Sequence, residues 1–87
     1  MMKHILMLLD ITTGELRFKY PIVTTVRLSD QQTIEGYAEQ YASEFYGSDA
    51  TINDGWYCFY GDSVRVKVFK ATELTKEHYD IVRTYLY

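Results

Sequence analysis

The 87-residue chain has one cysteine, one proline and two histidines, and these shortages exclude several classes of protein. The single cysteine, Cys58, cannot form an intrachain disulfide, so a secreted disulfide scaffold is excluded and a cytoplasmic location is expected. The histidines, His4 and His78, lie far apart in the sequence and do not form with Cys58 the cluster that a metal site or a nucleophilic site requires. We therefore expect a non-enzymatic protein with no metal ion or other cofactor.

Positive charge is missing from the middle of the chain. Residues 29–54 contain six carboxylates and no lysine or arginine, and the net charge of the whole chain is −3. This distribution argues against a general nucleic-acid binder and favours a basic partner for the acidic segment. Its candidate contact residues lie at helical positions: Glu35, Glu39 and Glu44.

Long apolar runs are missing as well. The run at residues 5–9 is too short for a signal peptide or a membrane span, so we expect no membrane contact. The run does not alternate with polar residues, which is typical of a strand that is covered on both faces or of one near the centre of the sheet.

The stretch at residues 55–68 predicts a β-hairpin around which the remaining chain is organised. Two segments rich in aromatic and β-branched residues flank Gly61 and Asp62, where glycine supplies the positive φ of a tight turn. With Tyr60 opposite Ser63, alternation along the strands gives the hairpin one core face. The members of that face are Tyr57, Phe59, Val64, Val66 and Val68. The members of the opposite face, called the outer face below, are Trp56, Cys58, Tyr60, Arg65 and Lys67.

Another hairpin is predicted nearer the N-terminus than the one at residues 55–68. Residues 5–9 and 15–20 pair across a turn at Gly14. Pro21 lacks a backbone donor, so the second strand bends, bulges or changes partner there, and residues 22–28 are either its continuation or a separate strand.

Two helices are predicted from apolar residues at helical spacing. The first begins at a Ser29 cap, and the second runs from a Thr75 cap to the chain end. Residues 48–54 are expected to form a polar loop between the first helix and the central hairpin. The alternation of the last strand fails after Val68, which indicates a bulge or the end of the strand.

In order, these elements predict one α+β domain that spans residues 1–87. We expect a four- or five-stranded antiparallel sheet with two amphipathic helices on one face, in the order β-β-(β)-α-β-β-α. The outer face then stays open, and Arg17 and Lys19 are expected to lie on it too.

The open outer face is the main indication of function. Its candidate binding residues are Trp56, Tyr60, Arg65 and Lys67. We expect a protein-interaction module in which a protein partner covers this face, or a second copy does so in a homodimer centred near Trp56. The alternative is single-stranded nucleic-acid binding, with the aromatic rings on bases and the basic groups on phosphates. No motif shows a family resemblance; short, tyrosine-rich chains are common among small proteins of phages and mobile elements.

Overall fold

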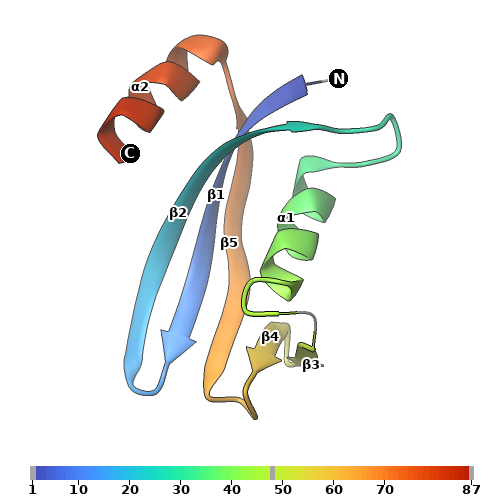
Figure 1. Ribbon diagram of the computed structural model, residues 1–87, viewed down its shortest axis with the longest axis vertical. Coiled ribbons are helices and arrows are strands. Elements are labelled where there is room, and N and C mark those ends of the chain that lie inside the picture. Colours follow the sequence, from blue (N-terminus) through green and yellow to red (C-terminus); the bar gives the residue numbers. More distant parts are fainter. Residues whose placement is uncertain (1, 48, 87) are drawn as a thin grey trace.

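The computed structural model describes residues 2–47 and 49–86 (Figure 1), and two long strands at the N-terminus begin its sheet. β1 (Met2–Thr13) and β2 (Leu16–Arg27) are antiparallel and pair along their whole length. Gly14 in the turn between them has a φ of 58°, which glycine adopts without strain. β2 continues through Pro21 as one strand, because an edge strand tolerates the missing backbone donor.

Three more strands complete the sheet: β3 (Thr51–Asn53), β4 (Trp56–Phe59) and β5 (Val64–Leu74). The strand order is β2-β1-β5-β4-β3, so β1 and β5 are central. The predicted hairpin is confirmed, with Phe59 opposite Val64 and Tyr57 opposite Val66. β3 lies where the sequence predicts a polar loop, and the part of that loop at Ser48 lies outside the described residues. The sheet therefore has five strands, one of them not predicted.

A β-bulge interrupts the pairing of β1 with β5. Leu8 is opposite Lys70 and Leu9 is opposite Val68, so Phe69 has no partner in β1. The break in alternation after Val68 is thus a bulge, and the strand continues beyond it. A bulge places two successive side chains where one is expected, and this shift decides which residues reach the outer face.

The main core lies between the sheet and α1 (Ile34–Ser43). Its members from β1 alternate along the strand and are at most 1% exposed: Ile5, Met7, Leu9 and Ile11. Ala38 and Ala42 pack on them from α1. We call this side of the sheet the inner face.

The cap of α1 is Thr33 rather than the predicted Ser29. The Thr33 hydroxyl accepts a hydrogen bond from the backbone N–H of Gly36 at 2.9 Å. The Gln32 side chain instead accepts from the backbone N–H of Ser29 at 3.0 Å and closes a separate turn before the helix. Half of the predicted capping box is therefore present, outside the helix that it was expected to start.

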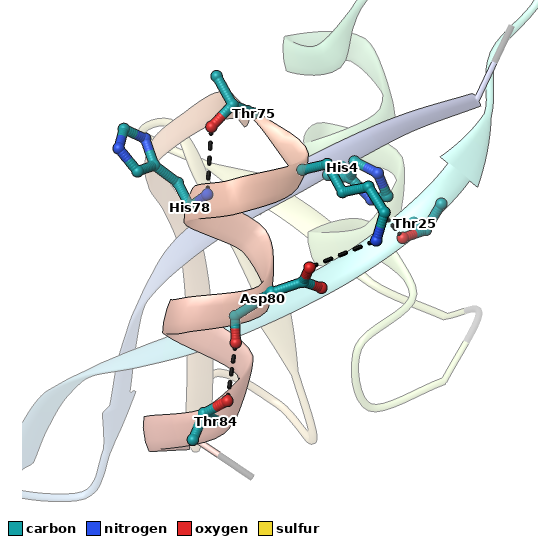
Figure 2. Close-up of polar contacts among 7 residues, drawn as sticks. His4, Thr25, Thr75, His78, Asp80 and Thr84 are labelled. Carbon is teal, nitrogen blue, oxygen red and sulfur yellow. Dashed lines mark hydrogen bonds and ion pairs between the residues drawn. The ribbon is translucent and has the colours of Figure 1, made fainter.

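The second helix, α2 (Lys76–Leu86), packs on the outer face, so the two helices do not share one face as expected. Its Tyr79 ring stacks on the His4 imidazole with 4.3 Å between centroids, and His4 alternates with the core residues of β1. Figure 2 shows α2 over the side of the sheet that carries His4 and Thr25. Val23, opposite Leu6 on the same side, is buried. The predicted Thr75 cap is confirmed by its bond from the His78 N–H at 3.1 Å.

The fold class is as predicted, an α+β domain with a five-stranded antiparallel sheet. The element order is β-β-α-β-β-β-α. The predicted end of the second helix at Tyr87 lies outside the described residues. Neither helix in the described part of the chain has the length and apolar character needed to span a bilayer.

Candidate functional site

α2 covers only one end of the outer face, near His4 and Val23. The other end carries five exposed cationic side chains from β2 and β5, here called the basic patch: Arg17, Lys19, Arg65, Lys67 and Lys70. Strand register places Asp10 of β1 on the same face, opposite both Lys19 and Lys67. Within the strands of the described chain, Asp10 is the one carboxylate on this face. The strand positions of the open end therefore carry five cations and one carboxylate, although the chain as a whole is negative.

Asp10 holds two members of the basic patch in place. Its carboxylate accepts from Arg17 Nη2 at 2.7 Å and from Arg17 Nε at 3.1 Å, and Lys19 Nζ lies 3.7 Å away. The Asp10 side chain is 5% exposed, whereas that of Arg17 is 62% exposed. Hydrogen bonding to Arg17 holds the pKa of Asp10 below its usual value. Asp10 thus holds Arg17 and Lys19 close to the sheet, and the sides of these two groups that face the solvent stay accessible.

Aromatic rings lie among these cations. The half-buried Trp56 ring has the Arg17 guanidinium 5.6 Å and the Lys67 ammonium 5.7 Å from its centroid. The Phe69 ring is 59% exposed, with the Lys19 ammonium 4.5 Å from its centroid. These distances fit cation–π contacts, which hold the charged groups beside flat apolar surfaces.

The structure brings three of the four predicted binding residues together and removes the fourth. Trp56, Arg65 and Lys67 lie on the outer face as predicted. Tyr60 does not, because its φ of 53° turns its side chain out of the strand alternation. Its hydroxyl donates to the backbone carbonyl of Tyr46 at 3.3 Å instead. Tyr60 is therefore excluded from the site.

The titratable groups often used in catalysis lie apart. Cys58 is 2% exposed, and burial raises the pKa of its thiol. His4 is hydrogen-bonded through Nδ1 to the Thr25 hydroxyl at 2.8 Å, while the exposed His78 points away from it (Figure 2). Among residues 2–47 and 49–86, no group of three or more histidine, cysteine or carboxylate side chains is placed to hold a metal ion.

The predicted acidic contact residues lie on the other side of the sheet, at α1. Glu35 is in the first turn and Glu44 caps the C-terminal end. Glu39 accepts a hydrogen bond from the Tyr57 hydroxyl at 2.5 Å, which joins α1 to β4. This bond raises the pKa of Tyr57 to about 12, and burial adds to the effect. One of the three candidate glutamates therefore already has a partner within the chain.

The Tyr57–Glu39 bond gives a measurable titration. We expect Tyr57 to ionise near pH 12 in the wild type, and Glu39→Gln to lower its pKa toward the ordinary value of 10.0 because the neighbouring charge is lost. Because the folded-state pKa is raised, the bond stabilises the fold below about pH 10, and this stabilisation is lost as the pH rises through the folded-state value. Ultraviolet absorbance titration of tyrosinate measures the shift, with Glu35→Gln as the matched control. A wild-type curve without a late-ionising phenol would contradict the prediction.

Comparison with known proteins adds no relative to this description. No family model matches the chain, and the comparisons with curated proteins and with solved structures found no match. The candidate function therefore rests on the basic patch, its aromatic rings and the separation of charge between the two faces.

Proposed function

We propose that this protein is a non-enzymatic binding module that holds single-stranded nucleic acid on the open end of its outer face. The observation that supports the proposal is the basic patch, in which five exposed cations are interleaved with the rings of Trp56 and Phe69. Lysine and arginine bind phosphates, and aromatic rings stack on unpaired bases of any sequence. A sheet surface that carries both can serve as a platform for such a strand.

The net charge of −3 does not oppose this proposal, because charge is separated across the sheet. The glutamates of α1 lie on the inner-face side, and the molecule measures 40 × 31 × 18 Å along its principal axes. At physiological ionic strength the Debye length is roughly 8 Å, so the α1 carboxylates are largely screened from a strand bound on the other side. The local charge therefore decides what binds the outer face.

An acidic segment of a protein partner is the second candidate, since the basic patch is equally complementary to carboxylates. This second candidate agrees with the protein-interaction module that the sequence predicts. The homodimer also stays a prediction. A two-fold axis near Trp56 would bring two basic patches together, and like charges buried across an interface are costly.

Fluorescence of Trp56, the one tryptophan of the chain, tests the proposal directly. We expect an oligothymidylate of about 15 nucleotides to quench it, with a slope of log K against log salt of about −2 to −3.5, as for three to five phosphate contacts. The double variant Arg65→Gln/Lys67→Gln should weaken binding about tenfold or more and reduce the slope by roughly 1.4. The matched control is Lys76→Gln/Arg83→Gln on α2, which removes the same charge away from the patch.

Three results would contradict the proposal. The first is quenching that does not depend on salt. The second is an equal loss of affinity in both double variants. The third is preferential binding of a polyglutamate peptide, which would favour the acidic protein partner instead. An unchanged circular dichroism spectrum of each variant shows that a lost affinity does not come from unfolding.

A further inference from the structure

A second site lies on the inner face, between β2 and the end of α1. A surface cavity of about 370 Å³ is lined by Tyr20, Tyr41, Glu44 and Phe45. The Phe45 ring is edge-on to both tyrosine rings, with 5.6 Å to the Tyr20 centroid and 6.0 Å to the Tyr41 centroid. The interplanar angles are 76° and 61°. Three aromatic rings, with that of Phe45 inclined to the other two, and one carboxylate thus line one surface hollow, called the aromatic cavity below.

The cavity exists because α1 does not extend over the edge strand. α1 packs chiefly on β5, so the inner face of β2 stays partly uncovered. Leu16, Phe18 and Tyr20 are consecutive inner-face residues of β2, and they are 69%, 42% and 45% exposed. Exposed apolar side chains that form one strip beside a cavity are typical of an interaction site rather than of ordinary surface.

The electrostatics around the cavity favour a cation. Glu44 is at its rim, and the C-terminal end of α1 contributes partial negative charge. Residues 29–54 contain no lysine or arginine. On the strand positions of the described inner face, Lys3 is the one cation, and it is paired with Glu73 at 3.1 Å. Lys3 is also far from the cavity. Leu9, which is opposite Tyr20, lies six residues further along β1, or about 20 Å at 3.3 Å per strand residue.

We propose that the aromatic cavity binds an alkylated ammonium group, the side chain of a methylated lysine in a partner peptide. Aromatic faces attract cations, and cages of such rings recognise quaternary ammonium groups. Methylation keeps the positive charge, whereas the bare ammonium of lysine is strongly hydrated and resists transfer into an apolar site. Glu44 supplies the counter-charge. The site lies on the face opposite the basic patch and does not depend on nucleic-acid binding.

A peptide fits better than a small free cation, because the apolar strip continues away from the cavity. Leu16 and Phe18 extend it along β2, which is an edge strand of the sheet. An extended peptide can pair with the free side of an edge strand while a side chain enters a neighbouring pocket. Choline could enter the cavity but would leave this strip exposed.

Calorimetric titration with four probes tests the assignment. The probes are a short peptide with one trimethyl-lysine, the same peptide unmodified, choline chloride, and 3,3-dimethylbutanol, which is the uncharged analogue of choline. We expect the methylated peptide to bind about tenfold more tightly than the unmodified one, and choline to bind more weakly than the methylated peptide but more tightly than the alcohol. Equal binding of choline and the alcohol would overturn the proposal, since the cavity would then be only an apolar hollow. Choline binding as tightly as the peptide would overturn the peptide assignment.

Substitutions at the rim test the cage itself. Tyr41→Ala is expected to weaken binding of the methylated peptide about tenfold, and Glu44→Gln about threefold, through loss of a ring and of the counter-charge. Tyr85→Ala on α2, where the side chain is 85% exposed, is the matched control and should leave the affinity unchanged. Because Tyr41 and Glu44 are exposed, neither change should unfold the protein, and circular dichroism checks this. Full affinity in both rim variants would overturn the proposal.

Discussion

Leu9→Ala is expected to destabilise the protein by about 2–5 kcal/mol, the usual cost of truncating a buried leucine. Leu9 is 0% exposed and lies in central strand β1, in the core that α1 covers. The loss is the sum of the transfer free energy of the missing carbons and the cost of the cavity that they leave behind. The cavity persists because strands that are paired on both sides cannot move in to fill it. A chain of this length has a total stability of about 4–13 kcal/mol, so this one change removes a large share of it.

Urea denaturation followed by circular dichroism measures the loss as a lower midpoint at an unchanged slope. The matched control is Leu16→Ala in the paired strand β2, where the side chain is 69% exposed. That control should change the free energy of unfolding by no more than about 0.5 kcal/mol. Similar losses in both variants would contradict the assignment of the core to the inner face at Leu9.

Local sequence patterns predict the central hairpin well because its turn and its pairing are both local. Gly61 and Asp62 have φ values of 63° and 72°, and alternation on either side places Tyr57 opposite Val66 as expected. β3 has no such pattern. All three of its residues are exposed, so its pairing with β4 depends on the neighbouring turn rather than on burial.

The position of α2 depends on tertiary structure, because an apolar helix stripe is compatible with either face of a sheet. One feature of the sequence does indicate that both faces of the sheet are covered. The run at residues 5–9 has no alternation, and in the structure its odd members face α1 while Leu6 and Leu8 face the opposite way. A strand that is apolar on both faces needs cover on both, and α2 supplies part of the second cover.

The candidate sites show the same division between local and distant information. Alternation predicts Trp56, Arg65 and Lys67 on one face, but the bulge at Phe69 changes the alternation, so the place of Lys70 could not be predicted. The predicted position of Tyr60 on the outer face is wrong, because its left-handed backbone turns the side chain away from that face. The aromatic cavity joins Tyr20 of β2 to residues at the C-terminal end of α1 that are 21 to 25 positions away, and no periodicity in the sequence connects the two segments.

Asp10→Asn is expected to cost about 1.5–3 kcal/mol at neutral pH, the range for hydrogen bonds to charged groups. The substitution keeps the shape of the side chain and removes its charge. Arg17 then loses a two-point ion pair and Lys19 loses its nearby counter-charge. The Asp10 side chain is 5% exposed, so water cannot replace these contacts as it does at the surface. Urea denaturation at about pH 7 measures the loss.

The dependence on pH separates the role of charge from that of packing. Since Arg17 lowers the folded-state pKa of Asp10 below 3.8, the carboxylate stabilises the fold fully above that value. The stabilisation is lost as the pH falls through the lower folded-state pKa, so the wild type and Asp10→Asn should converge in stability in acid. The control is Asp80→Asn, which breaks the exposed pair with Lys76 on α2 and should cost no more than about 0.5 kcal/mol. A difference between the wild type and Asp10→Asn that persists unchanged in acid would show that Asp10 acts through packing, not through its charge.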